Sequence, residues 1–247
     1  MMGTSHAVGG AAAWLALTAT ALPSLGVHPL PPEAVLLGLP VAAGAALLPD
    51  ADHPSATIAH SVPVAGRVAA GVLGAVSGGH RKGMHSLLAV VAVLLGTRAL
   101  AQVDAGSFHL GVALVVTACT AYGLKVLRIA RRWPAAWASG AAFGIVLGVL
   151  APERMAWLPW CVGAGYLAHL VGDLLTTGGV PLLWPVRVRA PRWARRAPVL
   201  RRIWLRSGAV AVPLVGDTGS WREQAVFVAL GAYVVWGACA EAVAAAA

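Results

Sequence analysis

Histidine and aspartate side chains gather in three short segments of this sequence. Residues 47–54 read LLPDADHP, residues 78–86 read GGHRKGMHS, and residues 169–173 read HLVGD. The chain of 247 residues holds only nine acidic residues and eight histidines, so this clustering is informative. Carboxylates and imidazoles together suit Zn²⁺, Mn²⁺ or Fe²⁺, whereas Mg²⁺ and Ca²⁺ favour oxygen donors alone. The pattern predicts a divalent metal site, with Zn²⁺ or Mn²⁺ as the expected ion.

The first segment places Asp50 and Asp52 between two prolines, Pro49 and Pro54. Proline resists continuation of a helix, and an extended Asp-x-Asp sequence turns both carboxylates to the same side of the backbone. Two carboxylates held together repel each other unless a cation lies between them. We therefore expect both aspartates to be metal ligands and His53 to exchange protons beside them. The alternative is a solvated turn at the membrane interface, since Asp and Pro are common turn residues.

The second segment carries His80 and His85, five residues apart. On a regular helix their side chains would point about 140° apart, so they converge only if His80 lies in the loop before the helix. His85 is then the better ligand candidate, and His80 is a candidate for proton transfer. Arg81 is the candidate for neutralising a phosphate group. Taken alone, His80 is equally well explained as a surface histidine.

The third segment places His169 and Asp173 four residues apart, on one face of a helix. Such a pair can chelate a metal, or it can bond only to itself between packed helices. His6 precedes the first apolar run and joins the set as a further candidate ligand. The predicted metal ligands are His6, Asp50, Asp52, His85, His169 and Asp173, and the predicted catalytic residues are His53, His80 and Arg81. A ligand set of this size can serve one ion or two.

Membrane helices must position these residues, because the composition does not suit water alone. The chain is 59% hydrophobic and 11% charged, with a mean hydropathy of +0.77, where a soluble domain carries about 25% charged residues. A bilayer-spanning helix needs about 20 mostly apolar residues. Seven segments approach that length, namely 7–25, 34–48, 86–100, 108–124, 137–150, 157–175 and 224–243. The sequence thus predicts an all-α polytopic transmembrane bundle of about seven spans, within a range of six to eight.

Residues 62–76 are also apolar, but the stretch is short and is interrupted by Arg67. We interpret it as an interfacial or re-entrant helix. If it crosses the membrane instead, the orientation of everything after it is inverted. The number of spans therefore depends on this segment.

Lysine and arginine residues lie beside the hydrophobic segments, as is typical of cytoplasmic loops. The 18 basic residues exceed the nine acidic ones, for a formal net charge of +9. With seven spans, the basic loops around Arg81, around 125–132 and at 187–206 share one side, which the positive-inside rule makes cytoplasmic. The amino terminus is then cytoplasmic and Arg154 lies on the opposite side. This placement favours membrane lipids as partners and makes nucleic acid an unexpected one, and the oligomeric state is left open.

We predict one membrane domain in three parts. Residues 1–185 form a membrane-embedded catalytic core, residues 186–223 form a basic cytoplasmic loop or interfacial helix, and residues 224–247 form the carboxyl-terminal transmembrane helix. The segment after Met1 has no Lys or Arg before Ala7, so a first membrane helix is expected rather than a cleaved signal peptide. The three cysteines lie in apolar segments without a CxxC pattern, and we expect them to be packing residues.

At these motifs the sequence resembles the YdjM-like family of bacterial inner-membrane proteins, which are described as membrane-bound metal-dependent hydrolases. The resemblance is carried by His6, by residues 47–54 and 80–86, and by residues 165–185 around His169 and Asp173. It implies a multi-pass protein of the bacterial cytoplasmic membrane with a metal-dependent hydrolase site. The family motif has a threonine where this chain has Met84, so no hydroxyl role is carried over to that position.

The leading hypothesis is a metal-dependent hydrolase at the inner leaflet, acting on a phosphoester or ester of a lipid-like substrate. Ligands at the depth of the lipid headgroups, beside many arginines, support this hypothesis. A metal-handling protein or ion transporter is the first alternative, and it would place polar residues at mid-bilayer on several helices. A non-enzymatic membrane anchor or regulatory partner, binding through residues 187–206, is the second. The concentration of ligands at one face disfavours the transporter.

Overall fold

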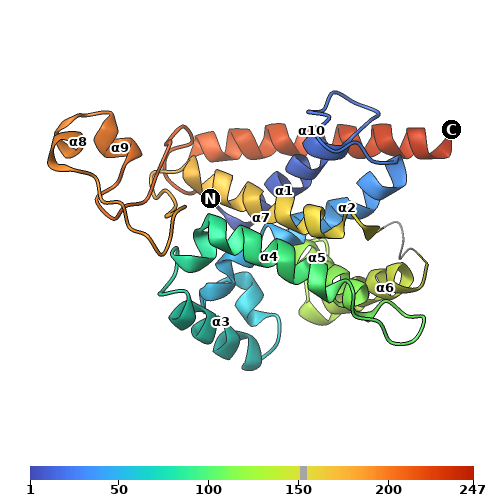
Figure 1. Cartoon of the computed structure of the whole chain (residues 1–247). Helices are drawn as coiled ribbons and strands as arrows, with labels where there is room; N and C mark the ends of the chain where they lie inside the picture. Colours follow the sequence, from blue (N-terminus) through green and yellow to red (C-terminus); the bar gives the residue numbers. More distant parts are fainter. Residues whose placement is uncertain (151–154) are drawn as a thin grey trace.

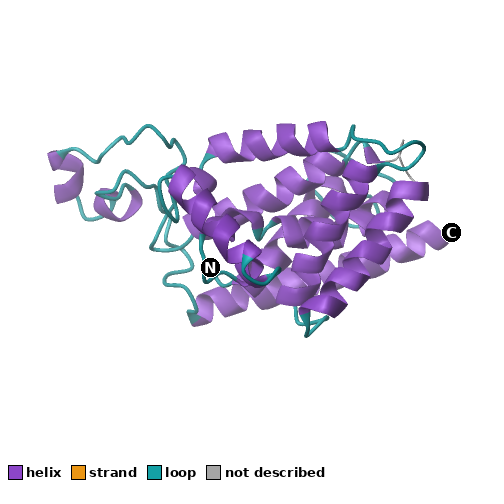
Figure 2. Ribbon diagram, turned by 90° about the horizontal axis from the view of Figure 1, so that it is seen from below, coloured by secondary structure: helices purple, strands orange, loops and turns teal. Residues whose placement is uncertain are grey.

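The computed structural model describes residues 1–150 and 155–247, and within these ranges it is all-helical, with isolated bridges but no strand (Figures 1 and 2). The long helices of the described chain form a bundle. They are α1 (Gly3–Thr18), α2 (Pro32–Ala45), α4 (Leu87–Leu100), α5 (Leu110–Val126), α6 (Trp133–Leu150), α7 (Leu158–Leu174) and α10 (Trp221–Ala246). Each corresponds to one predicted hydrophobic segment, and the all-α prediction is confirmed.

Shorter helices connect or flank the long ones. They are the 3₁₀ helices η1 (Leu48–Asp52), η2 (Thr57–His60) and η3 (Gly83–His85), and the α-helices α3 (Ala65–Val76), α8 (Arg192–Arg196) and α9 (Leu200–Ile203). The 3₁₀ helix η1 belongs to the segment 47–54, which holds two aspartates and a histidine, and η3 belongs to the segment 78–86, which holds two histidines.

Three segments of the described chain are long and apolar enough to cross a membrane, which is fewer than the seven predicted. They are Pro32–Asp52, Trp133–Leu150 and Trp221–Ala246. Several helices are shorter than their predicted spans. The first ends at Thr18 instead of residue 25, because the chain becomes extended at Ala19 and then meets Pro23 and the left-handed Gly26. The seven-span topology therefore stays a prediction, and Arg154 lies outside the described residues.

Glycine residues allow the central helices to cross closely. A Cβ atom on Gly10 of α1 or on Gly165 of α7 would lie 2.4 Å from the carbonyl oxygen of Ala42 in α2. A Cβ atom on Gly44 of α2 would lie 1.6 Å from the carbonyl oxygen of Cys119 in α5. Real side chains do not fit at such distances, so α1, α2, α5 and α7 depend on glycine for their backbone contacts.

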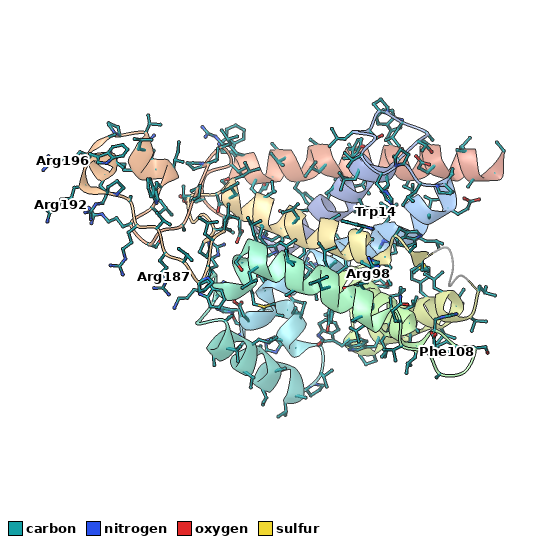
Figure 3. The ribbon with its side chains drawn as sticks, viewed as in Figure 1. Trp14, Arg98, Phe108, Arg187, Arg192 and Arg196 are labelled. Atoms are coloured by element: carbon teal, nitrogen blue, oxygen red, sulfur yellow. The ribbon has the colours of Figure 1, made fainter. Side chains whose placement is uncertain are left out.

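A buried aromatic core lies within this crossing. Trp14 is 1% exposed and lies inside the bundle, where its indole N–H donates to the carbonyl oxygen of Val35 at 2.9 Å (Figure 3). Its ring lies 5.4 Å from that of Trp157, between centroids. The hydrogen bond satisfies the polar end of a side chain that is otherwise packed among apolar groups, which fixes α1 against α2.

Two buried glutamates hold α10 along α1. Glu223, near the start of α10, accepts a hydrogen bond from the backbone N–H of Met2 at 2.6 Å. Glu241, near the other end, accepts from the backbone N–H groups of Thr20 and Ala21 at 2.8 Å each. Met2 precedes α1 and Thr20 follows it, so α10 lies along the whole length of α1 (Figure 1).

Two segments for which the sequence allowed alternative structures, residues 62–76 and 186–223, lie at the edges of the bundle. The stretch 62–76 contains α3, which packs on η1 and η2 and has only Ala70 buried. Its 12 residues span about 18 Å, well below the hydrocarbon thickness of about 30 Å. In the basic segment 186–223, α8 and α9 form a separate lobe at one end of the bundle, with Arg187, Arg192 and Arg196 on its outside (Figure 3).

Candidate metal centre

Five of the six predicted metal ligands meet where α1 begins and α7 ends. His6 lies on α1, Asp50 on η1, His85 on η3, and His169 and Asp173 on α7. The three histidines and Asp173 are at most 2% exposed, and Asp50 is partly exposed. Residues from four elements therefore converge in one small, mostly buried volume that opens toward solvent at Asp50.

Four donor atoms form the centre of this group. His85 Nε2 lies 3.3 Å from His169 Nε2. The two nitrogens lie 3.6 and 3.7 Å from Asp50 Oδ1, and 3.7 and 3.8 Å from Asp173 Oδ2. Two imidazoles and two carboxylates thus present one atom each to the same space. We call His85, His169, Asp50 and Asp173 the inner cluster.

These distances are better explained by donor atoms arranged around a divalent metal than by direct hydrogen bonds between the side chains. The four N···O distances exceed the hydrogen-bond range of about 2.7 to 3.2 Å. Two ligands bound tetrahedrally at about 2.0 to 2.1 Å from a zinc ion lie about 3.3 Å apart, close to the recorded separations. The inner cluster therefore has the donor chemistry and the spacing that a divalent cation requires.

The buried histidines also have the orientation of ligands. His169 Nδ1 donates to the carbonyl oxygen of Ala46 at 2.7 Å, because a carbonyl can only accept. The neutral ring then carries its lone pair on Nε2, which faces the inner cluster. His85 is fully buried, and its Nδ1 has no hydrogen-bond partner among the described residues.

Asp173 connects the inner cluster to a positively charged rim. Its Oδ1 lies 2.6 Å from the backbone nitrogen of Met1 and 3.3 Å from His6 Nε2. Its Oδ2 lies 3.1 Å from Arg81 Nη2. His6 stacks on His169 at 3.6 Å between ring centroids, so it borders the inner cluster as a second layer. It also forms an alternative donor group with His169 and Asp173.

The Arg81 side chain passes beside Gly178 to reach Asp173, and part of it stays exposed. A Cβ atom on Gly178 would lie 2.3 Å from Arg81 Nη1, so a larger residue there would displace the guanidinium. About a third of the Arg81 side chain, 33%, is exposed. Arg81 therefore lies at the opening of the site, where a guanidinium can meet an anionic group arriving from outside.

Asp52 lies outside the inner cluster and pairs with His80. Its Oδ1 accepts a hydrogen bond from His80 Nδ1 at 2.8 Å, and its Oδ2 is buried without a partner in the described part of the chain. The His80 ring lies 4.4 Å from that of His53 and 5.4 Å from that of His85, between centroids. The three predicted residues Asp52, His53 and His80 thus form a second group beside the first.

The prediction of an extended Asp-x-Asp sequence is wrong. Residues 48–52 form the 3₁₀ helix η1, with Pro49 in its first turn. With about three residues per turn, positions two apart point in different directions. Asp50 therefore faces the two buried histidines, whereas Asp52 faces His80. The expectation that His80 precedes the helix agrees with the structure, which places it in the turn before η3.

Sequence reasoning missed the groups that hold the ligands in place. Besides Ala46, Tyr166 donates its hydroxyl to the carbonyl oxygen of Met84, next to His85. Thr176 Oγ1 donates to the carbonyl oxygen of Asp173 at 2.7 Å. Tyr166 and Thr176 both lie within residues 165–185, the range that carries the family resemblance, so their position was a signal. Their partners are backbone atoms, which no residue type reveals.

Comparison with known proteins gives a family match over nearly the whole chain. The model of the YdjM inner membrane protein family matches residues 1–244. Two relatives named Inner membrane protein YdjM, from Escherichia coli (strain K12) and Shigella flexneri, are each 28% identical over 192 residues. This region is 77% of the chain and 61% of each relative, so the chain spans about three fifths of their length. No solved structure matches the chain.

Proposed function

This chain belongs to the YdjM inner membrane protein family, and from that premise we propose that it is a membrane-bound metal-dependent hydrolase. Its substrate would be a phosphoester or ester of a lipid-like molecule at the cytoplasmic membrane face. The observation that carries the proposal is the inner cluster, in which Asp50, His85 and His169 each offer a ligand atom within 4.8 Å of the others and Asp173 Oδ2 lies 3.7 Å from His85 Nε2. The proposed topology has seven spans and a cytoplasmic amino terminus.

The residues of the inner cluster would hold one divalent ion, with zinc or manganese as the best matches to a mixed nitrogen and oxygen donor set. Such an ion, when bound, acts as a Lewis acid and lowers the pKa of water toward neutrality. His6 would orient His169 by stacking and Asp173 by its 3.3 Å contact. Asp52, His53 and His80 would supply a second ion site or proton transfer.

The chain's own residues account for the remaining requirements of hydrolysis. The Arg81 guanidinium would bind the anionic oxygens of a phosphoester and hold it at the opening of the site. His80, oriented by its hydrogen bond to buried Asp52, would move protons between the site and solvent. The partial exposure of both Arg81 and His80 gives a substrate access to these groups.

A metal-handling protein or transporter is the second candidate function, because the same donors would also hold a transported ion. The location of the donors argues against it. They lie at the start of α1, after α2, before α4 and near the end of α7, which are all helix ends. A conduction path would need ionisable groups along the helices as well.

The direct test is elemental analysis of detergent-purified protein together with hydrolysis of a panel of phosphoesters and carboxyl esters. We expect a stoichiometric divalent metal and an activity that a chelator removes and the metal restores. Asp50→Asn should lose the metal, and Asp104→Asn, on an exposed loop, is the matched control. A well-folded, metal-free and inactive wild-type protein would refute the proposal, and bound metal without hydrolysis would favour the transporter.

A further inference from the structure

An apolar groove runs along α1 between α7 and α10 and ends at His6, beside the inner cluster. Its volume is about 430 Å³, within the usual range of ligand pockets of about 300 to 1,000 Å³. Helix α1 packs against both neighbours and contributes the small side chains Gly9, Ala12, Ala13 and Ala16. These four have the i, i+3, i+4, i+7 spacing of one helical face, so the groove has a smooth base.

One end of the groove is polar and reaches the site. His6 lines the groove and also stacks on His169 of the inner cluster. The other nitrogen of His6, Nδ1, is buried and has no hydrogen-bond partner among the described residues. From there to Leu17 the lining is apolar apart from a tyrosine, Tyr233. This lining suits an amphiphile whose polar end lies at His6, beside the inner cluster.

The length of the groove matches one membrane leaflet. His6 and Leu17 are eleven positions apart on α1, which corresponds to about 16 Å along a helix. Half of the hydrocarbon core of a bilayer is about 15 Å. A lipid chain lying in the groove would therefore reach from headgroup depth to the middle of the bilayer.

We propose that this groove binds an acyl chain of the substrate, which makes the substrate a lipid of one leaflet with its ester or phosphoester at His6 and the inner cluster. The inference rests on the proposed hydrolase function and adds the substrate class and the place of its chain. Residues of α1, α7 and α10 would then determine chain-length preference, while the inner cluster and Arg81 act on the headgroup.

Gly9 offers a clean way to fill the groove. A Cβ atom there meets nothing within 4 Å, so Gly9→Leu adds a side chain that begins in open space and extends into the groove. Gly96 of α4 is equally open and lies outside the groove lining, so Gly96→Leu is the matched control. Ala13→Leu is a second variant that narrows the same groove, should Gly9→Leu not give monodisperse protein.

The experiment uses phosphatidic acid with a photoreactive diazirine on its acyl chain, in phosphatidylcholine nanodiscs containing the full chain. Labelled peptides should map to residues 9–17, 164–175 and 226–233. Excess unlabelled phosphatidic acid should compete, and glycerol phosphate should not. Because the added side chain would occupy part of the space of the acyl chain and remove its packing contacts, Gly9→Leu should reduce this labelling by about tenfold. Gly96→Leu should leave it unchanged.

Hydrolysis assays test the lipid groove separately from the proposed hydrolase function. Gly9→Leu should slow hydrolysis of long-chain substrates far more than that of a water-soluble phosphoester, p-nitrophenyl phosphate, and Gly96→Leu should change neither. Labelling spread evenly over all helices and insensitive to Gly9→Leu would overturn the groove, even if metal-dependent hydrolysis persists. Groove-specific labelling in a metal-free, inactive protein would instead overturn the hydrolase and retain the lipid site.

Discussion

His169 and Ala46 are joined by a hydrogen bond of 2.7 Å from the imidazole Nδ1 to the backbone carbonyl oxygen. Ala46 directly follows α2, whereas His169 lies in the last part of α7. The bond therefore ties two helices together and also selects the tautomer whose Nε2 lone pair faces His85, Asp50 and Asp173. Helix packing and ligand orientation depend on the same contact.

Asp173→Asn should separate metal ligation from structural pairing. The amide keeps the size of the side chain, and its single carbonyl oxygen can still accept a hydrogen bond from either Met1 or Arg81, so the fold should persist. Losing the negative charge should lower metal affinity by about 10- to 100-fold or more. Elemental analysis and size-exclusion chromatography on one preparation would test this, with Asp217→Asn as the control. Normal metal content in the variant would exclude Asp173 as a ligand.

Asp50→Asn and Asp52→Asn should differ, although the two residues are only two positions apart. Asp50 faces the inner cluster, so its variant should lose metal and activity together. Asp52 faces His80, so its variant should keep metal at the inner cluster and lower turnover by about 10²- to 10⁴-fold, the usual range for general acid-base catalysis. Measurement of metal content and kcat for both variants tests this difference. Equal loss of metal in the two variants would contradict the assignment of Asp50 and Asp52 to separate groups.

Arg81→Ala should affect substrate binding more than metal binding. Removing the guanidinium takes a positive charge away from Asp173, so metal affinity should be kept or increased. Hydrogen bonds to charged groups are worth about 1.5 to 3 kcal/mol, which predicts a loss of about 10- to 100-fold in kcat/KM for a phosphoester. Arg81→Lys should recover only part of it, since a lysine cannot bind two oxygens with a planar fork. A fall in metal content would assign Arg81 a structural role instead.

Gly10→Ala should destabilise the protein, whereas Gly9→Ala should not. A Cβ atom on Gly10 would lie 2.4 Å from the carbonyl oxygen of Ala42, while one on Gly9 meets nothing within 4 Å. Overpacking of this kind costs about 1 to 3 kcal/mol. Thermal unfolding in detergent, followed by tryptophan fluorescence, would compare the two neighbouring variants. Equal unfolding temperatures would show that α1 and α2 can separate without cost.

The predicted topology places Lys82, Lys125 and Arg196 in the cytoplasm, because basic loop residues resist translocation. Reporter fusions beside these residues should give cytoplasmic signals, and a fusion beside Arg154 should give an external one. An external signal near Lys125 together with a cytoplasmic signal near Arg154 would overturn the seven-span arrangement. That outcome would also make residues 62–76 a membrane span.

The sequence by itself determined the helical class, the membrane environment and the residues that meet at the site. Apolar segments are a property of composition, and the long helices coincide with them because a helix satisfies its backbone hydrogen bonds locally. The pair His169 and Asp173 was readable for the same reason, since i, i+4 spacing on a helix fixes a shared face. His6, His85 and Asp50 were singled out by residue type and position beside those segments.

Only the tertiary structure decided which of those residues form the inner cluster, which form the second group, and what surrounds them. The separation of Asp50 from Asp52 follows from a 3₁₀ turn that begins at proline and that nearby packing completes, so the extended sequence predicted from residue types was wrong. The bonds from His169 to Ala46 and from Tyr166 to Met84 end on backbone carbonyls, which every residue has. The groove along α1 arises because buried Glu223 and Glu241 hold α10 against loops about 220 residues away in sequence. Contacts at such separation depend on the whole fold, and local pattern does not encode them.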